Sequence, residues 1–306
     1  QIKGAYSLVI LTNKKLIGVR DPFGIRPLVL GDKNGSPVLA SETCALDMIG
    51  AKYVRDIENG EIIVITESGM ESIKPFKQIA ERPCIFERIY FASPDSIVGN
   101  KTVYTYRKAL GEQLAIENNI IADVVVPIPD SGVSAAIGFS QKSKIPFELG
   151  IIRSHYVGRT FIEPSQTIRQ FGVKLKHSVN RSCIENKKVI LIDDSIVRGT
   201  TASKIVKMVY EAGAKEVHLG ISCPPILHPD FYGIDTPNYN QLIASKLNLK
   251  EMTEIVGANS LFFLSLNGTY KAMGCEKRNP KTPQFTDHCF TGEYPIDVTE
   301  ILKLNR

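Results

Sequence analysis

The sequence predicts an α/β protein, and two observations lead to that class. Over residues 1–75, short apolar runs alternate with turn-forming residues, which is the pattern of strands joined by tight turns. From about residue 80, predicted strands and helices alternate, and the apolar run at residues 189–192 is continuous, as in a strand buried on both faces. Such alternation predicts a parallel sheet with helices covering its faces.

The first segment is expected to form a mostly β layer with one short helix at residues 42–49. Its strands are predicted at residues 5–11, 16–20, 27–30 and 61–65. The second segment is expected to supply helices at residues 103–118, 134–140 and 202–212 and strands at residues 122–127, 189–192 and 216–221. The tail at residues 277–295 is rich in turn formers and is expected to wrap the domain surface.

Composition excludes several classes of protein. The apolar share of 43% and the charged share of 23% are those of a globular protein and argue against disorder. The net charge of +5 comes without a Lys/Arg run, which favours an anionic small substrate over nucleic acid. No run of eighteen apolar residues occurs, so no membrane span is expected.

The N-terminus and the cysteines suggest where the protein works. Gln1 is not a Met, and no signal-peptide pattern follows it, so the sequence is expected to be part of a longer chain. Six cysteines are scattered without a C-x-x-C spacing, which predicts reduced cytoplasmic thiols and no zinc site.

The candidate functional site follows the buried strand at residues 189–192. Asp193 and Asp194 stand at its carboxyl end, where ligands of open α/β sheets bind. Adjacent carboxylates are costly there unless they meet cations or ribose hydroxyls. Hydroxyls, a glycine and a helix N-terminus follow, a combination that predicts phosphate binding; the residues are Ser195, Ile196, Val197, Arg198, Gly199, Thr200 and Thr201. For the acid pair alone, a surface turn that caps the helix is an equally good explanation.

The string at residues 189–201 resembles the phosphoribosyl pyrophosphate (PRPP) signature of phosphoribosyltransferases. Over essentially its whole length, the sequence resembles the glutamine PRPP amidotransferases in these segments: residues 20–28, 41–47, 89–96, 127–132, 156–162 and 231–235. The resemblance implies a type I phosphoribosyltransferase fold at residues 78–306. It also implies that residues 1–77 are the C-terminal remnant of an Ntn-type, four-layer α+β glutaminase domain.

The family's activity is the first step of de novo purine synthesis. Glutamine is hydrolysed, and its ammonia displaces pyrophosphate from C1 of PRPP to give 5-phosphoribosylamine. The resemblance also implies a homo-oligomer, dimer or tetramer, with purine nucleotides as feedback inhibitors. Two alternatives stay open: a salvage base phosphoribosyltransferase, which the N-terminal β segment disfavours, and a PRPP-binding regulator, which the intact acid pair and the lack of a helix-turn-helix disfavour.

The resemblance assigns roles to individual residues. Asp193 and Asp194, as catalytic residues, together with Ser131, would hold Mg²⁺ and the ribose hydroxyls. Tyr156 and Arg159 would act from a loop that closes over PRPP and excludes water. Further PRPP contacts fall on Gly132, Arg153, Lys174 and Lys176. A proline-rich turn remains the alternative for the Ser131 segment, and a solvated strand face remains equally good for each lysine.

Two features depart from the family. Its glutaminase uses an N-terminal cysteine as nucleophile, and no residue of this sequence can take that role. Cys44 is interpreted as a core thiol, and the chain by itself is expected to use ammonia but not glutamine. Some members bind a [4Fe–4S] cluster through four cysteines; here Cys84 and Cys289 match, whereas Asp230 and Thr286 occupy the other positions, so no cluster is expected.

Overall fold

The computed structural model describes residues 2–154, 177–236 and 238–299. The chain forms two compact units. Unit 1 comprises Gln1–Tyr104, His228–Asn238 and Arg278–Arg306, and unit 2 comprises Thr105–Leu227 and Tyr239–Lys277. The expected domain boundary between residues 77 and 78 stays a prediction, because compactness and domain identity are different criteria.

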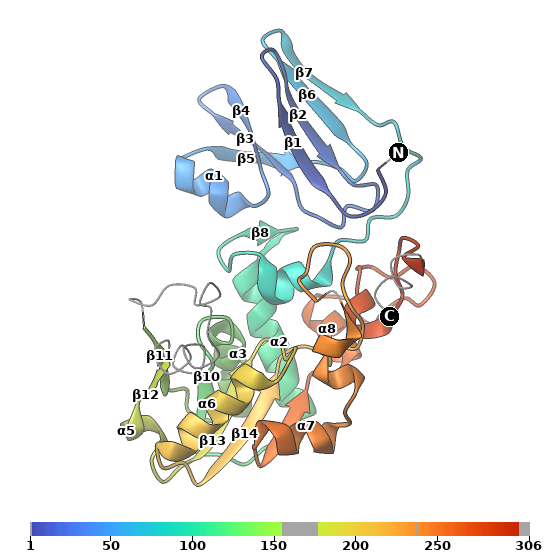
Figure 1. Ribbon diagram of the computed structural model, residues 1–306. Coiled ribbons are helices and arrows are strands. Elements are labelled where there is room, and N and C mark those ends of the chain that lie inside the picture. Colours follow the sequence, from blue (N-terminus) through green and yellow to red (C-terminus); the bar gives the residue numbers. More distant parts are fainter. Residues whose placement is uncertain (1, 155–176, 237, 300–306) are drawn as a thin grey trace, which may run out of the picture. The chain divides into compact units, whose positions relative to one another are not determined.

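Unit 1 contains two larger antiparallel sheets, drawn in blue and cyan in Figure 1. The first sheet has the order β1-β2-β6-β7, formed by Ser7–Leu11, Leu16–Arg20, Ile62–Thr66 and Gly69–Ile73. The second has the order β4-β3-β5, formed by Ser36–Ala40, Val29–Lys33 and Lys52–Asp56, with helix α1 at Thr43–Ile49. The β3–β4 hairpin turns at Asn34-Gly35, where both residues have positive φ, as a tight two-residue hairpin requires.

The two sheets of unit 1 share an apolar core. Leu30 of β3 and Ile63 of β6 belong to one buried cluster, against which Leu39 of β4 packs. A Cβ on Gly18 would lie 2.8 Å from Leu39 Cδ1 and 2.9 Å from Ile63 Cγ2, so β2 also lies in close contact with this cluster. Side chains from both sheets therefore interdigitate, as in a layered β domain.

The remaining elements of unit 1 are short. They are the π-helical turn η1 (Glu87–Phe91), the hairpin strands β8 (Ile97–Val98) and β9 (Lys101–Thr102), and helix α9 (His288–Thr291). An isolated bridge pairs Cys84 with Thr286, more than 200 positions later in the chain. The expectation that the tail wraps the surface is wrong for residues 285–290, which are buried and supply core side chains to unit 1.

Unit 2 is built on a parallel four-stranded sheet of order β10-β13-β14-β15. Its strands are Val124–Pro127, Lys188–Asp193, Glu216–Ile221 and Ser260–Phe263. Residues 189–192 of β13 are completely buried, because β13 lies between two neighbours and under helices on both sides. A small antiparallel pair, β11 (Ile151–Arg153) and β12 (His177–Val179), stands apart from this sheet.

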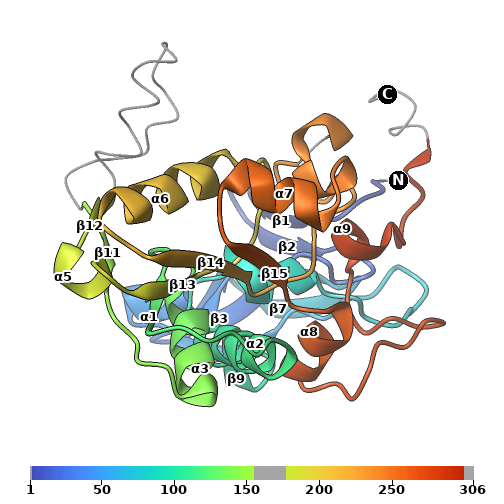
Figure 2. The same cartoon turned by 90° about the horizontal axis from the view of Figure 1, so that it is seen from below.

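Helices cover both faces of the parallel sheet. Figure 2 shows α6 (Thr200–Glu211) and α7 (Leu249–Val256) on one face and α2 (Val103–Glu117) and α3 (Val133–Ser143) on the other. Among the described residues of unit 2, the other helical elements are α5 (Arg181–Ile184), η3 (Tyr239–Gln241), η4 (Ile243–Ser245) and α8 (Leu266–Ala272). Helices α2 and α3 touch through glycine, since a Cβ on Gly111 would overlap the Ala135 carbonyl and one on Gly138 would overlap that of Lys108.

The structure confirms the α/β class and the covered parallel sheet. Each strand and helix predicted from the sequence is present, with its ends shifted by up to three residues. The elements that were not predicted are strands β4, β5, β7, β8, β9, β11, β12 and β15 and helices α5, α7, α8 and α9. Within the described residues, none of the helices has the length and apolar character needed to span a membrane.

Candidate functional site

The site candidate lies in unit 2 where the parallel strands β10 and β13 end. Pairing of these two strands sets Pro127 beside Ile192, and the Ile128 N–H then donates to the Ile192 carbonyl at 2.8 Å. The chain turns at once into α3, with Gly132 as its N-cap. A Cβ on Gly132 would lie 2.8 Å from the Ile128 carbonyl oxygen and closer still to that of Ile192, so only glycine fits this turn against β13.

Two carboxylates meet at this edge. Asp193 ends β13, and its Oδ1 accepts the Asp194 N–H at 2.9 Å, while Asp194 Oδ2 accepts the Ser195 hydroxyl at 2.6 Å. Burial raises the pKa of Asp193 well above its usual range, and the negative charge of Asp194 raises it further. A hydrogen bond from Ser131 to Asp193 opposes this shift and joins the two predicted segments.

The N-terminus of α6 follows the acids. Gly199 is its N-cap with φ of 74°, a left-handed conformation that favours glycine, and no side chain caps the helix. Its first N–H groups and the exposed residues Arg198, Thr200 and Thr201 are thus available to an anion. Ile196 is only 6% exposed, so it could contribute only its backbone to such a site.

Arg153 approaches the turn before α3. It stands at the end of β11 and forms an ion pair with Asp130. Four predicted site residues lie outside the described residues: Tyr156, Arg159, Lys174 and Lys176. The structure therefore brings together Ser131, Gly132, Asp193, Asp194 and Ser195 at one sheet edge, with the residues that open α6 directly after them.

The donor chemistry of the acid pair fits a hard divalent cation. In the described part of the chain, no ion pair joins Asp193 or Asp194 to a cationic side chain, although both carboxylates are largely withdrawn from water. Uncompensated acids of this kind are stabilised by a cation with oxygen ligands such as Mg²⁺. No group of three or more His, Cys, Asp and Glu side chains is arranged for a metal among the described residues, so a cation here would depend on other ligands, such as ligand phosphates or water.

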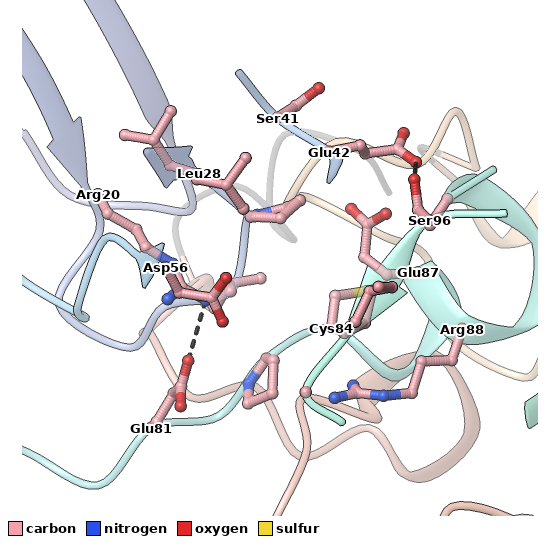
Figure 3. A pocket seen from close by; sticks show the side chains of 18 residues that line it. Arg20, Leu28, Ser41, Glu42, Asp56, Glu81, Cys84, Glu87, Arg88 and Ser96 are labelled. Carbon is pink, nitrogen blue, oxygen red and sulfur yellow. Dashed lines mark hydrogen bonds and ion pairs between the residues drawn. The ribbon is translucent and has the colours of Figure 1, made fainter. Parts of the chain in front are cut away.

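A separate cavity of about 130 Å³ lies within unit 1 and is rich in acids (Figure 3). Its acids already have partners in unit 1. Glu42 Oε2 accepts the Ser93 N–H at 2.7 Å and the Ser96 hydroxyl at 2.8 Å, and Glu87 pairs with Arg26 at 3.1 Å. These contacts indicate that the polar side chains of this cavity hold the unit together.

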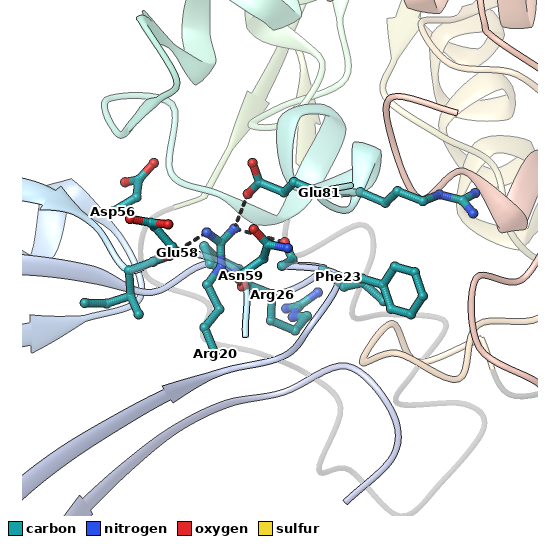
Figure 4. Close-up of polar contacts among 12 residues, drawn as sticks. Arg20, Phe23, Arg26, Asp56, Glu58, Asn59 and Glu81 are labelled. Carbon is teal, nitrogen blue, oxygen red and sulfur yellow. Dashed lines mark hydrogen bonds and ion pairs between the residues drawn. The ribbon is translucent and has the colours of Figure 1, made fainter. Parts of the chain in front are cut away.

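The segment at residues 20–28, on which the family resemblance partly rests, forms a cluster of buried hydrogen bonds (Figure 4). The Arg20 guanidinium donates to the carbonyls of Gly24 at 2.9 Å, Arg26 at 2.9 Å and Ile57 at 2.7 Å, and it pairs with Glu81 at 2.9 Å. Asp21 is fully buried and accepts three N–H groups of the same loop. Both side chains replace missing backbone partners, so this motif has a structural role in unit 1.

The four positions that the family resemblance assigned to cluster ligands are engaged otherwise. Burial first, and then Glu87 and Asp230, raise the pKa of the Cys84 thiol to about 12, which disfavours a thiolate ligand. Asp230 accepts the N–H groups of Tyr232 and Ile234, and its Oδ2 lies 2.7 Å from His288 Nε2. The Thr286 hydroxyl donates to the Arg82 carbonyl at 2.5 Å. These residues do not fit an iron–sulfur cluster.

Sequence reasoning missed some contacts and misread one residue. Asp130 was not singled out, although it lies inside the quoted 127–132 segment. Gln241 and Ile243 contact the phosphate-site candidate from a distant segment, and no periodicity or motif signals them. Cys44 is half-buried at the start of α1, so its interpretation as a core thiol is wrong.

Comparisons with known proteins agree with this geometry. A family model described as "Phosphoribosyl transferase domain" matches residues 108–229. The amidophosphoribosyltransferase of Rhizobium etli is 59% identical over 306 residues, which cover 98% of this chain and 62% of that protein. Amidophosphoribosyltransferase 1, chloroplastic, of Arabidopsis thaliana is 51% identical over 302 residues, covering 98% of this chain and 52% of that protein.

A solved structure extends the likeness to three dimensions. The glutamine PRPP amidotransferase of Bacillus subtilis, complexed with ADP and GMP, matches with a TM-score of 0.90 at 47% identity, over 97% of this chain and 65% of that one. The chain thus spans between about half and two thirds of the length of the relatives it matches. Its fold includes the type I phosphoribosyltransferase domain, and the chain belongs to the amidophosphoribosyltransferase family.

Proposed function

We propose that the protein that contains this chain is an amidophosphoribosyltransferase (EC 2.4.2.14), which converts PRPP, glutamine and water to 5-phosphoribosylamine, glutamate and pyrophosphate. This chain carries the PRPP half of the reaction. One observation carries the proposal: the buried acid pair Asp193–Asp194 directly precedes the uncapped N-terminus of α6. A phosphorylated sugar needs this combination of a metal or hydroxyl site with a phosphate site.

In this proposal PRPP lies along the carboxyl edge of the sheet. The N-terminal N–H groups of α6, with the hydroxyls of Thr200 and Thr201, bind the 5-phosphate. Asp193 and Asp194 orient the ribose hydroxyls, and these acids would hold Mg²⁺ together with Ser131. The turn at Ser131 and Gly132, with Arg153, faces the pyrophosphate.

The reaction replaces one bond at C1. The C1–O bond to pyrophosphate breaks, the C1–N bond to ammonia forms, and the nitrogen gives up a proton. Mg²⁺, when bound, neutralises charge on the departing pyrophosphate. The chain's own contribution is to fix C1 between the two phosphate sites and to stabilise developing charge without a covalent intermediate. Tyr156 and Arg159 are proposed to close over PRPP, and Lys174 and Lys176 to contact its phosphates.

Other properties follow the family and are proposals of the same kind. The B. subtilis structure contains ADP and GMP, which supports purine nucleotides as feedback regulators of this protein too. We propose a homo-oligomer, dimer or tetramer, that works in the cytoplasm without an iron–sulfur cluster. Several relatives carry the description chloroplastic, so location differs within the family.

A binding experiment on the full-length protein tests the proposal. Isothermal titration with PRPP in the presence of Mg²⁺ should give a saturable heat, and omission of Mg²⁺ should weaken it strongly. Pyrophosphate release should then depend on both PRPP and a nitrogen donor. Absence of PRPP binding at millimolar ligand with Mg²⁺ would refute the proposed function.

A further inference from the structure

A short segment from elsewhere in unit 2 contacts the loop before α6. The segment, residues 239–245, contains η3 (Tyr239–Gln241) and η4 (Ile243–Ser245), and we call it the brace. Within it Leu242 is fully buried, so the brace is anchored in the interior of unit 2. Gln241 and Ile243 of the brace contact residues 197–199 of the loop.

Three contacts join the brace to the loop. The Ile243 N–H donates to the Val197 carbonyl at 2.9 Å. The Arg198 guanidinium donates to the side-chain carbonyl of Gln241. A Cβ on Gly199 would lie 2.9 Å from Ile243 Cδ1, so these two residues are in close contact. Arg198, Gln241 and Ile243 also line one cavity together with Lys246.

The loop needs such support because of its composition. Gly199 has the largest backbone freedom of any residue type and sits at φ of 74°. Its N–H neighbours act on a phosphate only when their directions are fixed, and ordering them on binding would cost conformational entropy. A brace that fixes residues 197–199 in the free protein removes part of that cost.

We propose that Gln241 and Ile243 are positioning residues that hold the loop at residues 197–199 ready for a phosphate. Gln241 acts through Arg198, whose side chain it orients, and Ile243 acts through the Val197 carbonyl and Gly199. The brace itself follows from the contacts; its consequence for ligand binding depends on the PRPP site proposed above.

The experiment has one readout that needs no ligand. The Ile243 amide, bonded to the Val197 carbonyl, reports opening of the brace by hydrogen exchange. In Gln241→Ala of the full-length protein, loss of a hydrogen bond to a charged group should speed exchange of this amide about tenfold. Gln241→Glu keeps an acceptor for Arg198 and should restore slow exchange. Asn240→Ala, at an exposed neighbour in the same turn, is the control and should change nothing.

The second readout is the Kd of Mg²⁺–PRPP. Gln241→Ala should raise it about tenfold, while the melting temperature should fall by only about 3–6 °C, as expected for the loss of one hydrogen bond. Because Gln241 acts through Arg198, the double variant with Arg198→Ala should bind no more weakly than Arg198→Ala alone. Unchanged exchange at Ile243 in Gln241→Ala, or losses of affinity that simply add, would overturn the inference. A wild-type protein that fails to bind PRPP would refute the proposed function, whereas the exchange result would still decide the brace.

Discussion

Replacement of Asp193 by Asn should act in opposite directions on the free and the ligand-bound protein. Burial and the Asp194 charge raise the pKa of Asp193. An acid whose pKa is higher in the folded state costs stability when it is ionised, and this cost appears as the pH rises above the ordinary value of 3.8. Asn removes the charge but keeps an oxygen for the Asp194 N–H, now bonded at 2.9 Å. Without ligand at pH 7.5, the variant should therefore melt at the same temperature as wild type or higher.

With Mg²⁺–PRPP bound, wild type should instead melt at a higher temperature than Asp193→Asn. At 100 times its Kd, Mg²⁺–PRPP stabilises the native state by about 2.7 kcal/mol. For a unit of this size that raises the melting temperature by about 5–10 °C. Asp193→Asn should lose most of this rise, and for wild type the rise should be larger at pH 8 than at pH 5.5, because binding of the cation relieves the ionised pair.

Differential scanning calorimetry with and without Mg²⁺–PRPP measures both effects. Asp123→Asn is a matched control, because Asp123 lies at the opposite end of the sheet, where it accepts the Lys188 N–H at 2.8 Å. That control should keep the full ligand-induced rise. A variant at Asp193 that is destabilised without ligand but still fully stabilised by Mg²⁺–PRPP would contradict the assignment of this acid.

Three further predictions concern stability, the cluster and the turn before α3. Burial alone would raise the pKa of Glu61, but Arg55, the Glu58 N–H and Ser72 lower it to about 2. The free energy of unfolding of unit 1 should therefore fall by about 2 kcal/mol as the pH falls from about 4.5 to 2, a figure that allows for the partial exposure of Arg55. Acid titration of Glu61→Gln should lack this loss. Anaerobically purified protein should contain no stoichiometric iron or sulfide, and about four irons per chain would refute that expectation. Gly132→Ala should weaken PRPP binding at least tenfold in titrations, because its Cβ cannot fit against Ile128 and Ile192; an unchanged Kd would show that the turn can move.

Elements that combine a hydrophobic pattern with a clear boundary could be predicted from the sequence. Strand β13 is such a case, since its apolar run stops at two acids and a glycine loop, and both the strand and the site candidate follow from those residues. Strands β5 and β7 gave no such signal, because most of their side chains are exposed and lack an apolar alternation. Their pairing with β3 and β6 decides their conformation, and this tertiary contact cannot be read from local sequence.

Contacts between segments far apart in the chain were the second feature that the sequence could not predict. The tail was expected on the surface because its many turn formers suggest exposure, yet Thr286 pairs with Cys84 and both are buried. Gln241 stands 43 positions after Arg198 in a segment without periodicity. Such partners emerge only when the fold brings them together, because single polar residues in loops carry no spacing signal.

The same chemical feature, a buried carboxylate, has different consequences in the two units. Asp21 accepts three N–H groups of its own loop and Glu61 accepts a bidentate arginine, so each acid is fully used by the chain. Asp193 and Asp194 together accept hydrogen bonds from one N–H and two hydroxyls, and no described cationic side chain pairs with them. The negative charge of Asp194 raises the free-energy cost of ionising Asp193. Without a ligand, burying an unpaired acid in this way only lowers the stability of the fold. A cation and a polyhydroxylated ligand would relieve this imbalance, and this physical argument, independent of the likeness to other proteins, favours the edge of β13 as the site of chemistry.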